Sequence, residues 1–256
     1  MTARVTLFGI GVDPLTMDQT VDRCLAAVRD GARLEVGVVN AAKLVNMRRD
    51  PRLGDAVAGC DLVVADGQAV VWASRLLRAR LPERVAGIDL FTRLLAAAER
   101  EGYSVYFLGA KDHVLGEMAR RVAARYPALK VAGARDGYFG DADQEAVADA
   151  VRDSGADLLF LGMTSPKKEI FTAAHGHRTG VHVVHGVGGS FDILAGVTRR
   201  APRGWQRLGL EWLYRLLQEP RRLARRYLTT NAAFLLMTAR ELIRPTPAAG
   251  SANRSC

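Results

Sequence analysis

A carboxylate stands at the end of a β-rich run in the segment Asp61-Leu-Val-Val-Ala-Asp-Gly-Gln68. Asp66 follows apolar residues that favour a buried strand, and Gly67 then permits a sharp turn. Asp-Gly is ordinary turn chemistry, so a hairpin alone would explain the pair. A carboxylate at the mouth of a sheet would instead be placed to accept a proton from a substrate. The neighbouring elements decide between these two explanations.

Short β-rich runs alternate with amphipathic helical segments along most of the chain. An apolar run at 4–10 predicts a first strand. Further strands are predicted at 35–39, 61–65, 103–108, 129–134, 158–161 and 181–184. Helices are predicted at 16–30, 41–49, 68–80, 87–101, 113–126, 143–154 and 167–179. This alternation indicates an α/β fold with a Rossmann-like, mostly parallel sheet flanked by helices.

Ligands of such sheets bind beyond the carboxyl ends of the strands, so the residues that directly follow each strand form the candidate site. These positions are polar or rich in glycine: Asn40, Asp66, Gly67, Gly109, Lys111, Gly162, Gly186, Gly188 and Gly189. They predict one crevice along one edge of the sheet. Asp66 belongs to this crevice, which favours the chemical explanation over the plain turn.

Two segments of the predicted crevice are suited to an anion. Gly186-Val-Gly-Gly-Ser-Phe-Asp192 can bring backbone amides close to a diphosphate at the start of a helix, although a plain glycine-rich turn explains it equally well. It is not GxGxxG, so a nicotinamide cofactor is not implied. Lys167 and Lys168 stand in the first turn of a helix, against the helix dipole, where an anionic ligand would favour them. An ordinary exposed lysine pair is the alternative.

The sequence does not predict a metal ion. Asp141-Ala-Asp143 resembles a metal-binding DxD motif, but it precedes a polar helix, and helix capping explains it better. Four histidines fall on helix, turn and strand without a consistent ligand spacing: His175, His177, His182 and His185. We therefore expect neither a metal nor another cofactor.

The net charge of +9 is confined to the end of the chain. Residues 1–198 carry 24 Lys and Arg against 24 Asp and Glu, whereas residues 199–256 carry 12 Arg against 3 Glu. An apolar stripe in this end contains Trp205, Leu208, Trp212 and Leu216. The arginines near it are Arg203, Arg207, Arg215, Arg221, Arg222, Arg225 and Arg226. Arginines with interfacial aromatics favour an anionic membrane surface over a helix packed on the core or a nucleic-acid patch, since no nucleic-acid module is recognisable.

The chain divides into three predicted parts. Residues 1–198 are an α/β core, 199–244 an Arg-rich amphipathic helical appendage that docks on a membrane, and 245–256 a disordered tail. No apolar stretch reaches the roughly 20 residues of a spanning helix, and the first residues lack the apolar run of a secretory signal. Three isolated cysteines suggest a reducing compartment. We expect a cytoplasmic protein attached peripherally to the inner face of the cell membrane, with self-association as an open alternative.

Six motifs, in the same order along the chain, resemble those of the WecG/TagA/CpsF glycosyltransferases. They are Val39-Asn-Ala-Ala-Lys-Leu44, Ala65-Asp-Gly67, Glu83-Arg-Val-Ala-Gly-Ile-Asp89, Gly162-Met-Thr-Ser-Pro-Lys-Lys-Glu169, Gly186-Val-Gly-Gly-Ser-Phe-Asp192 and Gly209-Leu-Glu-Trp-Leu-Tyr-Arg-Leu-Leu-Gln-Glu-Pro-Arg-Arg222. The resemblance extends over residues 5–243.

This resemblance implies an inverting, metal-independent enzyme that moves a sugar from a UDP-sugar to a polyprenyl-diphosphate-linked sugar. Such enzymes assemble wall teichoic acid, enterobacterial common antigen or exopolysaccharide at the inner membrane face. By resemblance, Asp66 is the catalytic base, Asn40 and Arg84 line the donor site, and the appendage docks on the membrane and helps to close the site. The residues expected to bind the donor are Gly67, Gly109, Lys111, Gly162, Lys167, Lys168, Gly186, Gly188, Gly189 and Asp192.

Two positions depart from the teichoic-acid members of the family. Val38 stands where they often carry Thr, and Lys168 stands where they tend to carry Gln. The donor sugar is therefore left open among N-acetylmannosamine, its uronate and another hexose. Lys168 is expected to face a donor anion, either the diphosphate or a uronate carboxylate. A non-catalytic UDP-sugar-binding protein that is recruited to the membrane is the alternative function.

Overall fold

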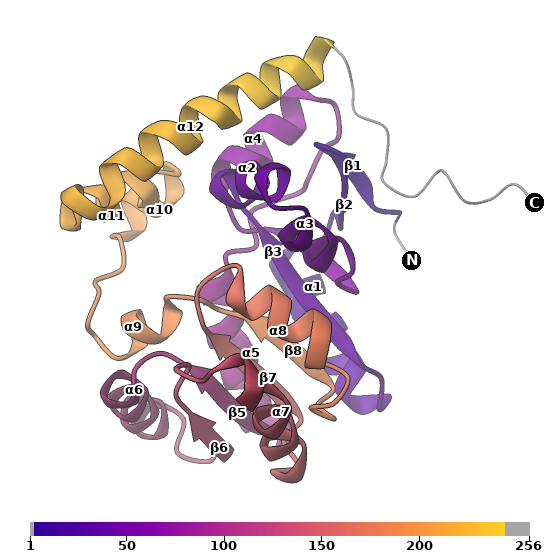
Figure 1. Ribbon diagram of the computed structural model, residues 1–256, viewed down its shortest axis with the longest axis vertical. Coiled ribbons are helices and arrows are strands. Elements are labelled where there is room, and N and C mark those ends of the chain that lie inside the picture. The colour runs from indigo at the N-terminus through magenta and orange to yellow at the C-terminus, as the bar shows by residue number, and fades with distance from the viewer. Residues whose placement is uncertain (1–2, 244–256) are drawn as a thin grey trace, which may run out of the picture.

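Figure 1 shows the computed structural model of the protein, in which residues 3–243 are described. Its centre is a six-stranded sheet with the strand order β4-β3-β8-β7-β5-β6. The strands are β3 (Leu34–Val39), β4 (Leu62–Ala65), β5 (Ser104–Gly109), β6 (Lys130–Arg135), β7 (Leu158–Gly162) and β8 (Val183–Gly186). All neighbouring strands are parallel. The predicted α/β fold with a parallel sheet is confirmed.

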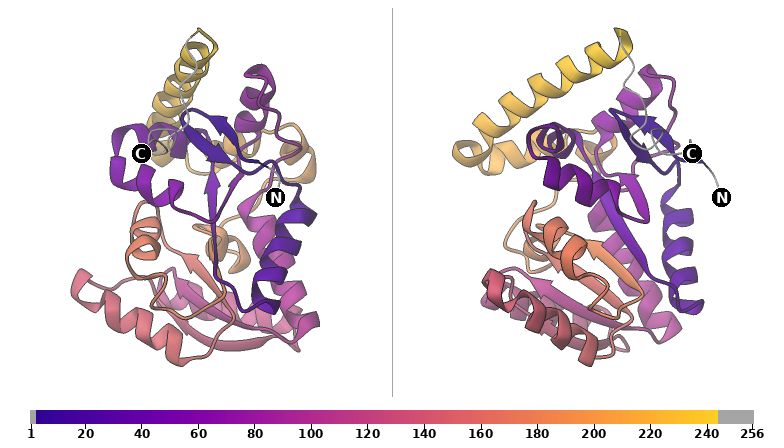
Figure 2. Two further views of the ribbon diagram at one scale, coloured as in Figure 1. Left: turned by 90° about the vertical axis from the view of Figure 1, so that its right-hand side faces the viewer. Right: turned by 45° about the vertical axis from the view of Figure 1, so that its right-hand side comes forward.

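Helices cover both faces of this sheet (Figure 2). They are α1 (Met17–Arg29), α2 (Ala41–Arg49), α3 (Pro51–Ala58), α4 (Gln68–Leu76), α5 (Gly87–Glu101), α6 (Asp112–Arg125), α7 (Gln144–Asp153), α8 (Lys167–His175) and α9 (Ser190–Leu194). One apolar cluster joins the sheet to α1, α5 and α6. The opposite face packs on α2, α3 and α4 at one end and on α7 and α8 at the other. Burial on both faces explains why the strands are continuous apolar runs.

The C-terminal segment is helical, as predicted. It contains α10 (Arg203–Arg207), α11 (Glu211–Gln218) and α12 (Pro220–Ile243). Figure 1 shows α12 lying across one end of the molecule, above α2 and α4. The ring of Phe234 packs 5.4 Å from the ring of Phe8, so α12 shares a core with the N-terminal part of the chain. The tail predicted at 245–256 lies outside the described residues.

One predicted strand needs correction, and one helix was not predicted. The single strand predicted at 4–10 is an antiparallel hairpin of β1 (Val5–Leu7) and β2 (Ile10–Val12), separate from the main sheet. Phe8 and Gly9 make its turn with φ of 54° and 84°, a conformation that Gly9 permits without strain. Helix α3 was not predicted, although Asp50 caps it and Pro51 begins it, which is a typical helix start.

Asp141-Ala-Asp143 stands at the start of a helical segment, as the capping interpretation predicted, but Asp143, the N-cap residue of α7, makes no side-chain capping hydrogen bond to that helix. These residues form a short 3₁₀ turn directly before α7. The carboxylate of Asp143 accepts from the N–H of Gly140 at 3.2 Å, and the carboxylate of Asp141 accepts from the side chain of Gln144 at 2.7 Å. Both acidic groups are therefore used at the start of this helical segment.

The ends of β5 and β7 approach each other at two glycines. A Cβ on Gly109 would lie 2.4 Å from the carbonyl carbon of Gly162, and φ of Gly109 is 141°. A Cβ on Gly162 would lie 2.2 Å from the ring of Phe191 on α9. Glycine at these positions therefore lets α9, which also carries Asp192, pack on the ends of the strands.

The substitution Gly162→Ala tests this packing. The new methyl group must displace the ring of Phe191, so we expect a loss of about 1–3 kcal/mol in the free energy of unfolding by urea. Gly116→Ala is the matched control, because a Cβ there meets nothing within 4 Å. In the middle of α6 that change should stabilise by up to about 1 kcal/mol. A Gly162→Ala protein as stable as the wild type would contradict the packing described.

Candidate active site

Asp66 lies directly after β4, and backbone groups hold its carboxylate. Its N–H donates to the carbonyl oxygen of Val39 at 2.9 Å, and its Oδ1 accepts from the N–H of Gly87 at 3.0 Å. Gly87 is the first residue of α5, so the carboxylate lies at the positive end of a helix. The structure therefore places Asp66 at the sheet edge with a fixed orientation.

Asn40 and Gly67 lie beside Asp66. Asn40 follows β3, the neighbour of β4, and its Oδ1 caps α2 by accepting from the N–H of Lys43 at 3.0 Å. A Cβ on Gly67 would lie only 3.0 Å from the Cβ of Asn40, so glycine allows this close approach. The amide nitrogen of Asn40 carries two donors, which are the groups suited to contact a sugar.

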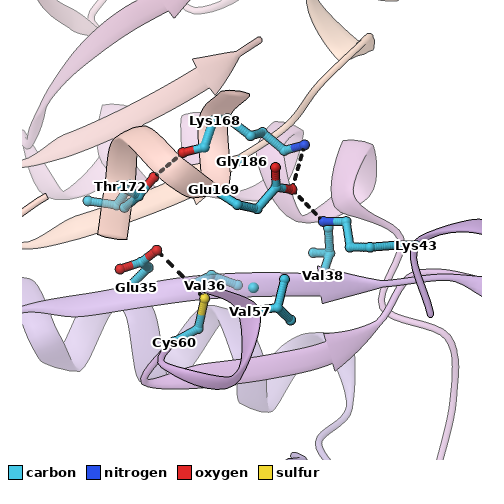
Figure 3. A pocket seen from close by; sticks show the side chains of 12 residues that line it. Glu35, Val36, Val38, Lys43, Val57, Cys60, Lys168, Glu169, Thr172 and Gly186 are labelled. Atoms are coloured by element: carbon cyan, nitrogen blue, oxygen red, sulfur yellow. Dashed lines mark hydrogen bonds and ion pairs between the residues drawn. The ribbon is translucent and has the colours of Figure 1, made fainter. Parts of the chain in front are cut away.

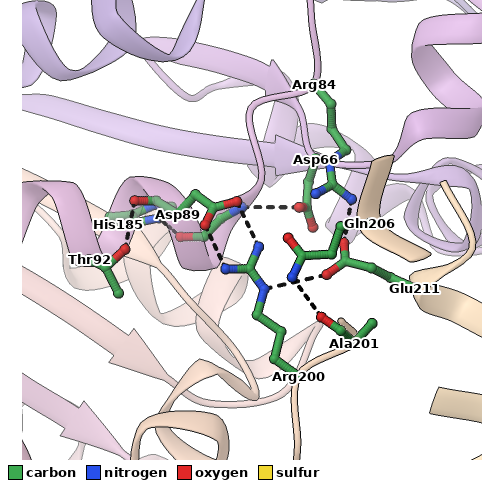
Figure 4. Close-up of polar contacts among 10 residues, drawn as sticks. Asp66, Arg84, Asp89, Thr92, His185, Arg200, Ala201, Gln206 and Glu211 are labelled. Carbon is green, nitrogen blue, oxygen red and sulfur yellow. Dashed lines mark hydrogen bonds and ion pairs between the residues drawn. The ribbon is translucent and has the colours of Figure 1, made fainter. Parts of the chain in front are cut away.

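Arg84 reaches the same edge from the loop before α5. The N–H of Val85 donates to the carbonyl oxygen of Ala65 at 2.9 Å, which fixes this loop beside the end of β4. The side chain of Arg84 is 14% exposed, and its Nη1 pairs with Oε2 of Glu211 on α11 (Figure 4). Arg84, which belongs to the α/β core and is expected to line the donor site, is thus held by the C-terminal helices.

A chain of ion pairs continues from this contact (Figure 4). Oε1 of Glu211 lies 3.4 Å from Nε of Arg200. Nη1 and Nη2 of Arg200 donate to the two carboxylate oxygens of Asp89 at 2.6 and 2.7 Å. The hydrogen bonds to Asp89 are the main cause that raises the pKa of Arg200. Asp89 lies in the first turn of α5, so this series of ion pairs ends on α5, the helix whose first N–H donates to Asp66.

Three charged side chains from α2 and α8 are buried together (Figure 3). Oε1 of Glu169 lies 2.7 Å from Nζ of Lys43 and 2.8 Å from Nζ of Lys168. Burial, followed by repulsion from Lys43, lowers the pKa of Lys168 to about 8, whereas the charges of Glu169 and Asp66 act in the opposite direction. Burial alone would raise the pKa of Glu169, but the two ammonium groups lower it to about 2.

Lys168 depends on Gly186 for its space. A Cβ on Gly186 would lie 2.9 Å from Cε of Lys168. In the structure the ammonium group contacts Glu169 and only 9% of the side chain is exposed. The expected contact between Lys168 and a donor anion stays a prediction, and the structure adds that a carboxylate of the protein already pairs with it.

His185 is a site residue whose role the sequence did not reveal. Its ring is fully buried, and Nε2 lies 3.1 Å from the carbonyl oxygen of Gly87, to which it donates. Burial lowers the pKa of His185 to about 4, so the imidazole is neutral at pH 7. The N–H of Gly87 donates to Asp66, so His185 contacts the residue that orients this carboxylate. Its place near the end of a strand, β8, was the available signal.

The glycine-rich turn after β8 leads directly into α9. Gly188 has a φ of 52°, and Gly189 is the residue before the helix. The main-chain carbonyl of Asp192 accepts from the N–H groups of Val197 and Thr198 at 2.9 and 3.1 Å. Nucleotide binding by this turn stays a prediction, which the exposed position of Gly189 permits.

Two predicted donor-binding lysines lie elsewhere on the edge. Lys111 is exposed at the start of α6. Nζ of Lys167 donates to the carbonyl oxygens of Gly137 and Phe139, both at 2.9 Å, and so holds the loop after β6. Their binding roles stay predictions, whereas Asn40, Asp66 and the loop that carries Arg84 lie beside one another at the ends of β3 and β4.

The outer surface of the C-terminal helices is basic and apolar. The predicted docking arginines that the structure describes are all exposed: Arg203, Arg207, Arg215, Arg221 and Arg225. The side chains of Arg222 and Arg226 lie outside the described part of the structure. Exposed apolar side chains accompany the arginines, among them Leu208, Trp212, Leu217, Leu228, Leu235, Leu236, Leu242 and Ile243. This is the composition expected of a membrane-facing surface.

Within the described residues 3–243, no three or more His, Cys, Asp or Glu side chains gather as a metal ion would require. No helix in the same range is both long and apolar enough to span a membrane.

Residues 5–248 match the sequence model of the glycosyl transferase WecG/TagA/CpsF family. The chain is 39% identical over 174 residues to a protein of Bacillus spizizenii strain W23, covering 68% of this chain and 67% of that protein. The relative is named N-acetylglucosaminyldiphosphoundecaprenol N-acetyl-beta-D-mannosaminyltransferase.

Removing the carboxylate of Glu169 tests the buried charge cluster. Glu169→Gln leaves two buried ammonium groups without their shared partner, so we expect a loss of about 3–5 kcal/mol in unfolding free energy at pH 7. Adding Lys43→Met should restore part of this loss. Glu145→Gln, which removes an exposed partner of Arg178, should cost less than about 1 kcal/mol.

The pH dependence of the unfolding free energies of the wild type and Glu169→Gln provides a second check. A lowered pKa means that the ionised Glu169 stabilises the fold above its unfolded pKa of about 4.3, and that this contribution is lost as the pH falls through the folded value of about 2. The wild type and Glu169→Gln should therefore converge in stability at low pH. A constant difference between pH 7 and pH 2 would contradict the assigned charge.

Proposed function

The chain belongs to the WecG/TagA/CpsF family of glycosyl transferases, and we propose that it moves a sugar from a UDP-sugar to a sugar linked to a polyprenyl diphosphate. The named relative supports the acceptor, because its name specifies an N-acetylglucosaminyl-diphosphoundecaprenol substrate. The product would enter the assembly of a cell-surface polysaccharide. The donor sugar is N-acetylmannosamine, its uronate or another hexose, and Lys168 would face an anion of the donor, either the diphosphate or a uronate carboxylate.

One observation carries the proposal: Asp66 is fixed at the end of β4, beside Asn40 and the loop that carries Arg84. In an inverting transfer, the acceptor hydroxyl oxygen forms a bond to the anomeric carbon of the donor sugar. The bond from that carbon to the UDP oxygen breaks, and its electron pair leaves with the diphosphate. The hydroxyl proton passes to Asp66, whose carboxylate is oriented by the N–H of Gly87.

The leaving diphosphate needs positive charge. We propose that Arg84 supplies it, with help from backbone amides of the glycine-rich turn at 186–189 and from Lys168, so that no metal ion is required. Planar guanidinium groups suit this task because they present several donors to phosphate oxygens. We assign the base to Asp66 alone, since His185 is fully buried and its Nε2 donates to the carbonyl oxygen of Gly87.

The membrane would supply the acceptor. The exposed arginines and apolar side chains of α10, α11 and α12 suit an anionic lipid surface, which would hold the enzyme where its polyprenyl substrate lies. We propose peripheral attachment at the inner face of the cell membrane on this basis.

The central test is release of UDP from a panel of UDP-sugars, with and without a polyprenyl-diphosphate-linked sugar. The wild type should release UDP from one donor only when the acceptor is present. Asp66→Asn should lower kcat by about 10²–10⁴-fold while UDP binding, measured by calorimetry, is retained. Equal turnover by Asp66→Asn would remove the base role from Asp66, and UDP binding without turnover on any donor would favour a non-catalytic protein.

Asp141→Asn is the matched control. Its carboxylate contacts the side chain of Gln144 away from Asp66, so activity should stay within about twofold of the wild type. Because no metal is proposed, a chelator should leave the wild-type rate unchanged. A rate abolished by the chelator and restored by a divalent cation would contradict metal independence.

Membrane attachment is tested with the full chain and phosphatidylglycerol vesicles. Replacing Arg203, Arg207, Arg215, Arg221 and Arg225 by Gln should weaken vesicle binding at least a hundredfold, since each surface arginine contributes about 1 kcal/mol. The control replaces five exposed arginines on the surface of the α/β part of the chain: Arg29, Arg93, Arg100, Arg125 and Arg152. Equal losses in both proteins would contradict a specific docking surface. Tight binding of the wild type to DNA but not to vesicles would favour a nucleic-acid partner.

A further inference from the structure

We propose that Glu211 and Arg200 are positioning residues, through which the C-terminal helices hold Arg84 in its working orientation. This inference rests on the proposed function in one respect, namely that Arg84 meets the charge of the leaving diphosphate.

The contacts form one continuous path between the two parts of the chain. Glu211 is the first residue of α11, and it receives Arg84 from the core on one carboxylate oxygen and Arg200 on the other. Arg200 in turn grips both oxygens of Asp89 on α5. The signs alternate along Asp89, Arg200, Glu211 and Arg84, so each charge has an opposite neighbour (Figure 4).

Partial burial makes this path stronger than a surface ion pair. The side chains of Arg84, Arg200 and Glu211 are 14%, 24% and 25% exposed. Charges shielded from water attract each other more than exposed ones, and a bidentate pair such as Arg200 with Asp89 also fixes geometry. A free arginine side chain would instead sample many rotamers, and ordering it during the reaction would cost free energy.

Glu211 can orient Arg84 and still leave hydrogen-bond donors of its guanidinium for a ligand. The hydrogen bond to Glu211 comes from Nη1 of Arg84, and a guanidinium carries five N–H donors in total. The remaining donors are suited to a diphosphate. Glu211 itself would touch neither the donor nor the acceptor, so its effect on catalysis should be expressed only through Arg84.

A double-mutant cycle on the full chain tests this prediction by turnover. Glu211→Ala should lower kcat about tenfold or more with KM within about threefold, because Arg84 matters most as charge develops on the leaving group. In a protein that already carries Arg84→Ala, adding Glu211→Ala should change kcat by less than about twofold. The proposal would be overturned if the double variant lost kcat by the product of the two single fold losses, or if Glu211→Ala were fully active.

Glu117→Gln is the matched control for this cycle. Glu117 on α6 also lies between two arginines, Arg120 and Arg121, but in an exposed cluster apart from Arg84. Its replacement should leave both kcat and KM unchanged. Glu211→Asp keeps the charge with a shorter reach, and should recover part of the activity that Glu211→Ala loses.

Hydrogen exchange provides a readout that needs no substrate. Glu211→Ala and Arg200→Ala should speed amide exchange across 203–218 by about tenfold or more, whereas Glu117→Gln should not. A wild type that fails to transfer any sugar would refute the proposed function, but the exchange result would still stand. Unchanged exchange in both variants would show that Glu211 and Arg200 do not hold the helices on the core, and would overturn the inference.

Discussion

The common direction of the six central strands is the constraint on which the rest of the site depends. Parallel strands end at the same edge of a sheet, so Asn40, Asp66 and Gly186 come together although they are far apart in the chain. The helices that follow begin at this edge, which brings their N-terminal N–H groups there as well. The N–H of Gly87 shows the consequence, since it orients the carboxylate of Asp66.

Charge is distributed around this edge in two linked groups. On one side, Lys43, Glu169 and Lys168 are buried together and leave one net positive charge near Asp66. On the other side, the path from Asp89 to Arg84 joins the core to the C-terminal helices. A buried ion pair rarely stabilises a fold by itself, because desolvation opposes the attraction. Both groups are better explained by what they do to the orientation and charge of the site.

The sequence predicted the parts of this arrangement that follow from local pattern. Apolar periodicity located the central strands, and the resemblance of six motifs pointed to Asp66, Asn40 and Arg84. The sequence pattern did not reveal the turn at Phe8 and Gly9, because an uninterrupted apolar run resembles one strand. It also missed Pro51 and its helix, although the capping signal was present.

Long-range partners were beyond reach of the sequence. Nothing near Glu211 in the chain indicates that it meets Arg84, which is 127 residues away. His185 stood out only as one of several histidines, and its bond to Gly87 depends on the packing of β8 against α5. Lys168 was expected to meet a ligand anion. In the structure it pairs with Glu169, which also binds Lys43, 126 residues away in the chain.

The most direct measurement is a crystal structure of the Asp66→Asn enzyme with a UDP-sugar and a soluble diphosphate-linked acceptor. The substitution should stop the reaction and preserve the complex. The proposal predicts the acceptor hydroxyl within about 2.6–3.2 Å of the side chain at position 66, with the guanidinium of Arg84 on the diphosphate and still paired with Glu211. An acceptor hydroxyl facing another proton-accepting group, with Asp66 remote from it, would contradict the central claim.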